Sequence, residues 1–276
     1  MTVGKLLSSF LLAAAAGTLP VQAQEDLGGA TAQSTRAEQA AFRDGFSVAP
    51  YFWVTFYSGT MTVNGQTINM SGTNVFDLLR SGDLNFPPLV GVFEWRLDNG
   101  LGIYLDTTAI GLHFGASDIS LGPGPVTAAL GLDFTYVLAH AGVVIDSREW
   151  QGNGFSNDLD YLVGLRYTYY DLDLSGTVGP VPVSFRDTLS WADATVGVRL
   201  RGKNANGVTY SLLGDIGFGQ GKSAQGLALI GKTWKNARTD LNLFGGYRVL
   251  YQDWSDGDDA IDLTTHGPVV GLQWTF

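Results

Sequence analysis

Apolar and polar residues alternate along most of this chain with the two-residue period of a β-strand, and the final segment shows the pattern most clearly. One face of that segment carries Phe276, Trp274, Leu272, Val270 and Pro268. The positions between them are small or polar in all but one case. Because successive side chains of a strand point to opposite faces, the segment predicts a strand with one face in apolar surroundings.

Ten segments share this alternation and are interpreted as strands, near residues 46–58, 84–97, 100–113, 127–144, 158–172, 187–201, 206–217, 223–235, 238–252 and 262–276. Short connections alternate with long ones, the long ones being 114–126, 173–186 and 253–261. This alternation of turns and loops is typical of transmembrane barrels. Two connections depart from it, since 145–157 is interpreted as a long turn and 218–222 as a short loop.

The parity of apolar residues does not by itself separate a soluble β-sandwich from a barrel that faces a membrane. Tyr and Trp residues at the ends of the apolar faces favour the barrel, in which aromatic residues form girdles at the membrane interfaces. In a bilayer only a closed barrel pairs the backbone groups of every strand. The pattern therefore predicts an all-β, antiparallel transmembrane β-barrel of about ten strands, with eight or twelve as alternatives.

Two neighbouring segments fall outside the alternation. Asn64-Gly65 is a strong signal for a two-residue hairpin turn, so residues 59–72 are expected to extend the first strands as a hairpin. Residues 73–80 carry apolar side chains at helical spacing, which predicts a short inserted helix. Because so short a helix needs a surface to pack on, we expect it to form a constriction in the lumen through Val75, Phe76, Leu78 and Leu79.

The first residues have the features of a secretory signal peptide. Lys5 supplies a positive charge, residues 6–16 are apolar, and Val21-Gln22-Ala23 resembles a cleavage site. The expected organisation is a signal peptide at 1–23, a flexible periplasmic lead-in at 24–44 and an outer-membrane barrel at 45–276. A transmembrane anchor is the alternative, but the apolar stretch is shorter than the ~20 residues that a spanning helix needs.

The amino-acid composition argues against several classes of binding partner and functional site. The formal net charge is −10, which argues against binding to nucleic acid. The chain has no cysteine, so it has neither disulfides nor thiolate metal ligands. The expected partners are outer-membrane lipid, lipopolysaccharide and the barrel assembly machinery, with no cofactor.

Several short motifs resemble a group of uncharacterised proteobacterial outer-membrane β-barrel proteins. The motifs are Ala49-Pro50-Tyr51-Phe52-Trp53, Ser58-Gly59-Thr60, Phe76-Asp77-Leu78-Leu79, Phe93-Glu94-Trp95-Arg96, Gly164-Leu165-Arg166-Tyr167, Gly246-Tyr247-Arg248 and Gly267-Pro268-Val269-Val270-Gly271-Leu272. The resemblance implies a fold and a location, but no activity. The end of the chain also resembles an outer-membrane assembly signal, formed by Phe276, Trp274 and Leu272.

The inward face of the predicted barrel carries charges in balance. Parity places six acids and six bases there, which are Glu94, Asp106, Asp133, Asp160, Asp193 and Asp215 together with Arg96, Arg166, Arg199, Arg201, Lys232 and Arg248. Because an unpaired buried charge is costly, we expect a ladder of ion pairs in a narrow interior. The partner of Arg166 is sought among Asp160, Asp193 and Asp133. A solute pathway through these groups is the alternative.

Other candidate sites are weaker. His113 and His266 are expected near the extracellular ends of lipid-facing strand faces, and His113 is followed by Ser117 and Asp118, but no hydrolase signature accompanies them. The last long loop is rich in acids, with Asp256, Asp258 and Asp259 as weak candidates for binding a cation. Their spacing does not match a calcium loop, so we expect no metal site.

The sequence thus predicts an integral outer-membrane barrel with a structural or small-solute channel role, and no enzymatic activity. An adhesion or interaction barrel that acts through its extracellular loops is the second hypothesis. A lipid-modifying outer-membrane hydrolase is the third. The sequence does not indicate a solute or an oligomeric state.

Overall fold

A computed structural model describes residues 45–69, 83–97, 101–120, 127–178, 181–235 and 239–276. All of them belong to one of the two compact units of the chain, Ala40–Phe276. The predicted signal peptide, the lead-in and the predicted helix at 73–80, with its four constriction residues, lie outside the described residues. No helix occurs in the described ranges, and so none there could cross a membrane.

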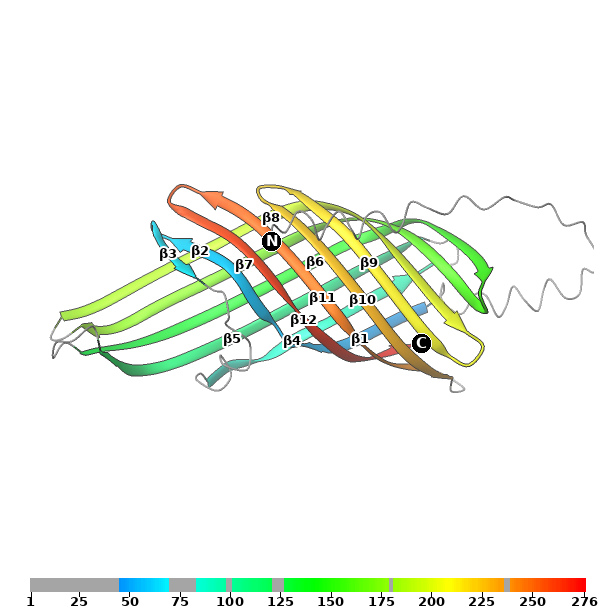
Figure 1. The fold of residues 1–276 in the computed structure, drawn as a ribbon, viewed down its shortest axis with the longest axis horizontal. Helices are drawn as coiled ribbons and strands as arrows, with labels where there is room; N and C mark the ends of the chain where they lie inside the picture. Colours follow the sequence, from blue (N-terminus) through cyan, green and yellow to red (C-terminus); the bar gives the residue numbers. More distant parts are fainter. Residues whose placement is uncertain (1–44, 70–82, 98–100, 121–126, 179–180, 236–238) are drawn as a thin grey trace, which may run out of the picture. The chain divides into compact units, whose positions relative to one another are not determined.

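The described residues form twelve strands. They are β1 (Gly45–Trp53), β2 (Phe56–Val63), β3 (Gln66–Asn69), β4 (Asp83–Arg96), β5 (Gly102–Ser120), β6 (Thr127–Gly152), β7 (Phe155–Val178), β8 (Val181–Asn204), β9 (Val208–Gly219), β10 (Lys222–Lys235), β11 (Asp240–Asp256) and β12 (Asp259–Thr275). From β4 to β12 each strand pairs antiparallel with the next one in the chain (Figure 1).

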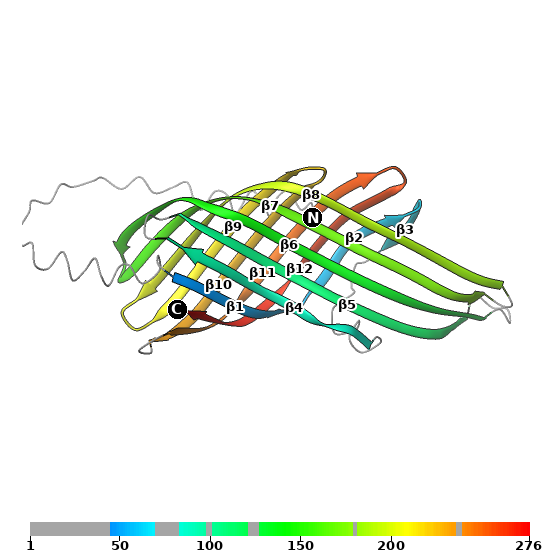
Figure 2. The same ribbon diagram turned by 180° about the vertical axis from the view of Figure 1, so that it is seen from behind.

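The sheet closes into a barrel because β1 pairs on both of its edges. On one edge it pairs with β4, where Gly45 lies opposite Arg96. On the other edge it pairs with β12, where Ser47 lies opposite Thr275. With β2 and β3 set apart, ten strands form the closed wall, as the sequence predicted. Figure 2 shows the same wall from the side of β4, β5 and β6.

The first strand of the barrel is interrupted. At Val54 the backbone N–H donates to the carbonyl of Pro268 (2.9 Å), and β2 then continues along β12 from Phe56, opposite His266. Gly267 lies beside the interruption with a φ of 155°, and a Cβ there would meet the carbonyl oxygen of Val54 at 1.7 Å. The interruption therefore depends on a residue without a side chain.

The hairpin predicted at Asn64-Gly65 is confirmed. Both residues have positive φ, 49° and 73°, as a type I′ turn requires, and β3 returns along β2. On its other side the hairpin tip meets the β11–β12 turn, where the Asn64 N–H donates to Asp259 Oδ1 (2.6 Å). The hairpin thus extends the first strand without adding a strand to the wall.

The long turn predicted at 145–157 is wrong. β6 and β7 continue as paired strands to a tight turn at Asn153 and Gly154, where φ is 53° and 76°. The charged stretch Asp146 to Glu149 has the composition of a loop, which hid the strand. In the same way β7 and β8 extend well into the predicted loop at 173–186.

An apolar belt surrounds the outside of the wall. Its members alternate with inward residues and remain exposed, as in Leu212, Ile216 and Phe218 on β9, or Val270 and Leu272 on β12 with Phe276 just after it. From position 266 of β12 to Phe276 the belt matches the ~9–11 residues that a tilted strand needs to cross a bilayer. A closed wall with such a belt is the architecture of a membrane-spanning barrel.

Two adjacent glycines of β11 test the packing of this wall. A Cβ at Gly246 would lie 1.9 Å from the carbonyl oxygen of Ala228 on β10, whereas a Cβ at Gly245 meets its nearest atom at 3.6 Å. We expect Gly246→Ala to destabilise the barrel by about 1–3 kcal/mol and Gly245→Ala to have little effect. Urea unfolding of the refolded variants measures both, and equal midpoints would contradict this packing.

Candidate functional site

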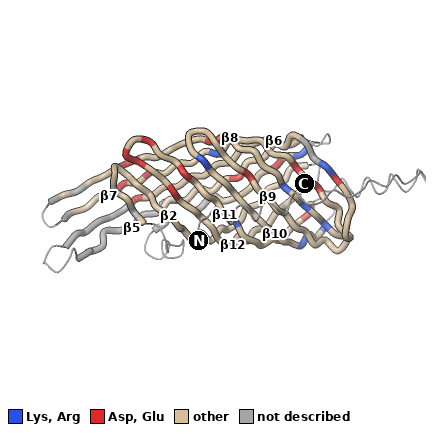
Figure 3. The backbone as a smooth tube through the Cα atoms, turned by 45° about the horizontal axis from the view of Figure 1, so that its top comes forward, with Lys and Arg blue, Asp and Glu red and all other residues tan. Residues whose placement is uncertain are grey.

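The interior of the barrel is divided into two tiers along its axis. We call the end that carries Gly45 and Phe276 the terminal end, and the end formed by the β11–β12 and β2–β3 turns the far end. Lys and Arg residues gather toward the terminal end, and Asp and Glu residues are frequent at the far end (Figure 3). Inside the wall, a charged tier lies toward the terminal end and an aromatic tier toward the far end.

Three arginines and three acids form the part of the charged tier nearest the terminal end. Arg199 bridges Glu94 (2.7 Å) and Asp160 (2.8 Å), and Arg96 contacts the same two carboxylates. Arg201 pairs with Asp158 at 2.6 Å. These side chains come from β4, β7 and β8, so the cluster ties together strands on either side of the lumen.

A second ion pair lies deeper in the charged tier. Arg166 of β7 contacts Asp215 of β9 at 2.5 Å and donates to Ser223 Oγ at 2.8 Å. Ser223 in turn donates to Asp193 at 3.2 Å. Arg166 thus reaches Asp193 only through Ser223, and its direct partner is not one of the three acids expected from the sequence.

Arg248 forms the boundary between the two tiers. Its guanidinium contacts Asp106 at 2.8 Å and donates to Tyr51 and to Gln225, at 2.5 and 2.6 Å. The same group lies over the ring of Trp53, 4.7 Å from its centroid. Arg248 therefore joins β1, β5 and β10 to β11 across the lumen.

Burial explains why these charges are paired. Asp160, Arg166 and Asp193 have no exposed surface, and Arg248 is 1% exposed. An ion removed from water is stable inside a protein only when hydrogen bonds and opposite charges replace its hydration. Because these charged side chains are held in ion pairs, they have little freedom to bind and release a solute that moves through the lumen.

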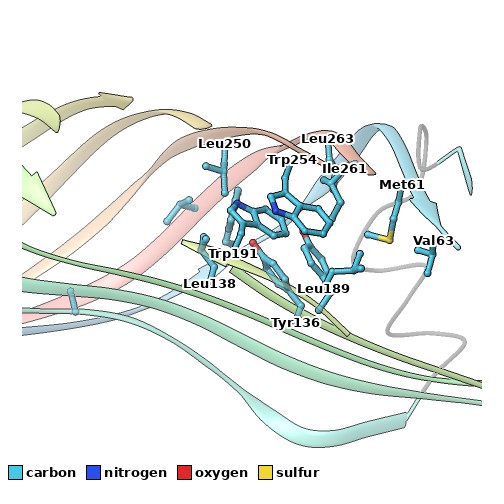
Figure 4. Close-up of a cluster of buried hydrophobic side chains, with 14 of the residues drawn as sticks. Met61, Val63, Tyr136, Leu138, Leu189, Trp191, Leu250, Trp254, Ile261 and Leu263 are labelled. Atoms are coloured by element: carbon cyan, nitrogen blue, oxygen red, sulfur yellow. The ribbon is translucent and has the colours of Figure 1, made fainter. Parts of the chain in front are cut away.

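The aromatic tier fills the far part of the lumen with a contiguous cluster of buried side chains. We define it as Met61, Val63, Tyr136, Leu138, Tyr170, Leu189, Trp191, Leu250, Trp254, Ile261 and Leu263. At its centre the indole rings of Trp191 and Trp254 stack at 5.1 Å with an interplanar angle of 13° (Figure 4). Tyr170 also stacks on Trp191, with ring centroids 6.0 Å apart.

Contacts across the lumen show that opposite walls meet in this tier. Trp191 belongs to β8 and Trp254 to β11. The β9–β10 hairpin, which lies between these two strands in the sheet, is short and ends before it reaches the level of the two rings. Gln252 of β11 donates to Thr168 of β7 at 2.7 Å. Side chains of the described residues thus occupy the space between the walls.

A cavity of about 190 Å³ remains in the terminal half of the barrel. Its lining begins at the terminal rim, with Lys203, Asp240 and Thr275, and extends inward to Arg248 and Gln225. The charged tier forms one side of this cavity. Its rim is at the terminal end, and described side chains of the aromatic tier lie beyond its inner end, so we call it the blind cavity.

Ten of the twelve predicted ladder residues lie on the inward face, but Asp133 and Lys232 do not. Asp133 is exposed, and Tyr136, Leu138 and His140, on the other face of β6, are buried. Both faces of this segment are apolar, so the sequence offered no contrast from which to assign its parity. Lys232 shares its face with Ile230 and Trp234, which are 64% and 50% exposed.

The remaining predicted site residues lie on the outside or at the far end. Phe276 and Leu272 are exposed in the belt, with Trp274 between them, and the Phe276 ring stacks on Phe46 at 6.4 Å. The weak cation candidates Asp256, Asp258 and Asp259 occupy the β11–β12 turn. In the described ranges no group of three His, Cys, Asp or Glu side chains is placed to hold a metal ion.

The two histidines that the sequence placed on lipid-facing strand faces do not form a described catalytic group. His266 lies at the far edge of the belt, where Nδ1 and the Tyr247 hydroxyl are 2.7 Å apart and Phe56 stacks on its ring. His113 occupies a position on β5 opposite Asp133 of β6, and its side chain is outside the described part. The arrangement at His266 is that of an aromatic girdle.

The structure adds interior residues that the sequence did not reveal. Asp158 begins the strand predicted near 158–172 and shares the parity of Asp160, so the same parity could have placed it on the inward face. His140 is 2% exposed, with its Nε2 at 3.0 Å from the Tyr104 hydroxyl and 2.9 Å from Thr195 Oγ1. Only the inward parity of β6 would have indicated it.

Comparison with known proteins finds similarity of structure only. No protein-family model and no curated protein matches the chain. Among solved structures, the chain is similar to the outer membrane protease OmpT from Escherichia coli, with 10% identity, a TM-score of 0.35 and coverage of 84% of this chain and 97% of that one.

Two further solved structures are similar at the same low level. The translocator domain of autotransporter NalP from Neisseria meningitidis has 13% identity, a TM-score of 0.33 and coverage of 90% and 96%. The CymD monoaromatic hydrocarbon channel has 10% identity, a TM-score of 0.21 and coverage of 92% and 94%. At these values the comparisons transfer no activity to the chain.

The Arg166–Asp215 pair provides a test of the charged tier. We expect Arg166→Met and Asp215→Leu each to destabilise the barrel by about 3–5 kcal/mol, because each leaves a buried charge without its partner. The double variant should lose less than the sum, with a coupling of roughly 0.5–3 kcal/mol. Urea unfolding in lipid vesicles, followed by tryptophan fluorescence, measures the cycle.

The matched control is Arg186→Met, which removes an arginine from the exposed pair with Asp171. This pair is in water, where screening leaves ion pairs weak, so the midpoint should not move measurably. Additive losses in the Arg166 cycle, or an equal loss in the control, would contradict a paired interior.

Proposed function

We propose that the chain is an integral outer-membrane β-barrel with a closed lumen and a structural role in the cell envelope. The observation that carries this proposal is the aromatic tier, which joins opposite walls across the barrel interior. Both ends of the barrel chain face the periplasm, and outer-membrane lipid and lipopolysaccharide surround the apolar belt. The barrel assembly machinery is the partner during insertion.

Of the two roles expected from the sequence, the closed lumen favours the structural role over the small-solute channel. A diffusion channel keeps a polar, water-filled interior. Here the far half of the lumen contains stacked rings and aliphatic side chains, such as Trp191, Trp254 and Leu263, each 8% exposed or less. In the terminal half, ion pairs fix the arginines Arg96, Arg199 and Arg201 in place, so these side chains line a cavity and not a water-filled passage.

A second candidate function is supported by the length of four strands. β5, β6, β7 and β8 have 19, 26, 24 and 24 residues, about twice what a bilayer crossing requires. Toward the far end the described outward residues of β7 and β8 become polar, as at Asp171 and Arg186. This surface would serve the adhesion or interaction role that the sequence left open.

Planar bilayers test the closed lumen. We expect the refolded full-length protein to insert without a steady conductance, because the described side chains of the aromatic tier fill the lumen. Circular dichroism provides the control for folding, since the stacked indoles of Trp191 and Trp254 give an exciton couplet. The couplet should disappear in Trp254→Phe and persist in Trp95→Phe, whose indole lies in the belt. A stable ohmic conductance from protein with the couplet would overturn the proposal.

Location and assembly depend on the last residue. The Phe276 N–H donates to the carbonyl of Phe46 (3.0 Å), so deleting Phe276 removes both a closing hydrogen bond and a stacked ring pair. We expect the deletion to lower the yield of heat-modifiable protein in outer-membrane fractions several-fold. Deleting one residue within 24–44 is the control. Equal yields would remove the support for an assembly signal, and recovery as a soluble periplasmic species would reject the outer-membrane location.

A further inference from the structure

The blind cavity in the terminal half has two chemically different sides. One side is largely apolar, with Leu213, Leu227, Leu229, Phe244 and Val269 contributed by β9 to β12 beside polar groups such as Ser211 and Asn242. Its apolar part offers no partner for the hydrogen bonds of water. It favours a ligand that has an apolar body.

The other side of the cavity carries more positive than negative groups. Five cationic side chains line it, which are Arg96, Arg199, Arg201, Lys203 and Arg248. Three acids share the lining, which are Glu94, Asp106 and Asp240. The acids Asp158 and Asp160 pair with the arginines but are not part of the lining. With these two acids the cluster as a whole is balanced, but the groups at the cavity surface are five cations and three acids, and these are the groups that a ligand contacts.

One of these arginines retains a free donor. Arg96 is 4% exposed, and its Nε and Nη2 contact Glu94 and Asp160. Its Nη1 is buried and has no hydrogen-bond partner among the described residues. A buried donor without a partner is costly, and a guanidinium N–H is matched best by a carboxylate or another oxyanion.

The size of the cavity limits the ligand. An apolar cavity of roughly 150 Å³ accommodates benzene in another protein. The cavity here, at about 190 Å³, has room for one ring or a short chain together with a small charged group.

We propose that this cavity is a binding site for a small organic monoanion with an apolar body, a carboxylate of about the size of benzoate. The carboxylate lies toward Arg96 and the neighbouring guanidinium groups, and the apolar body packs against Leu213, Leu227 and Phe244. The ligand enters at the terminal rim, past Lys203, because the aromatic tier closes the far side. The site goes beyond the structural role and does not depend on it.

Binding is measured on the refolded full-length protein in detergent by fluorine NMR with 4-fluorobenzoate, in competition with benzoate. We expect saturable binding, and at least tenfold weaker binding of benzyl alcohol and benzylammonium, which lack the anionic group. Neutral or cationic probes that bind as tightly as benzoate would overturn the assignment of an anion. Absence of saturable 4-fluorobenzoate binding would overturn the site itself.

Two adjacent leucines of β9 supply the matched variants. Leu213 lines the cavity, whereas Leu212 is 45% exposed on the outer face. Leu213→Trp should fill the cavity and weaken binding at least tenfold, and Leu212→Trp should bind as the wild type does. Equal binding by both variants would place the ligand in the detergent or elsewhere on the protein, and so reject the site.

A rim variant covers the case in which Leu213→Trp fails to fold. Lys203 lies at the rim and pairs with Asp240 at 3.3 Å, so Lys203→Gln removes one cation and keeps all the arginines of the cavity. We expect a several-fold loss of benzoate affinity, larger at low salt because the missing attraction is electrostatic. Unchanged affinity at low salt would contradict entry past Lys203 toward a cationic site. A conductance found in bilayers would reject the closed lumen but leave this binding measurable.

Discussion

The structure depends on one constraint, which is that backbone hydrogen bonds in a bilayer must be satisfied within the protein. Strand β1 meets it by pairing with β4 on one edge and with β12 on the other, which joins the first described strand to the last. Without β1, both neighbours would present unpaired N–H and C=O groups to lipid. Closure then directs alternate side chains of every strand into a narrow interior. The ion pairs and the packed rings of the lumen are consequences of that confinement.

Confinement has opposite consequences for the two kinds of inward side chain. Apolar rings and aliphatic groups gain by leaving water, so Trp191, Trp254 and Leu250 pack directly in the aromatic tier. Charged groups lose hydration and recover it only through partners, so Glu94 and Asp160 each contact more than one arginine. The barrel interior is therefore tied together at two levels by different forces, with a cavity left in the terminal half.

The strands could be predicted from the sequence because alternation is a local property, visible within ten residues. Partners across the lumen could not, since Arg166 and Asp215 are 49 residues apart and on strands that are not neighbours. Local contrast also explains the errors. Where both faces were apolar, as around Asp133, parity was lost, and where a strand became charged, as at Asp146 to Glu149, it resembled a turn. To predict the site, one must know which residues of different strands face each other across the lumen. The alternation along each strand does not give this information.

The two tiers give the barrel an internal difference in its response to temperature. Hydrophobic stabilisation weakens on cooling, because the large heat capacity of apolar hydration makes burial enthalpically unfavourable at low temperature. The desolvation penalty of ion pairs instead falls as the temperature rises. The stacked rings around Trp191 and Trp254 are thus the part that loosens first in the cold, while the arginine network around Asp160 is the part that gains relative strength in the heat. One short lumen thereby combines a cold-sensitive and a heat-tolerant half.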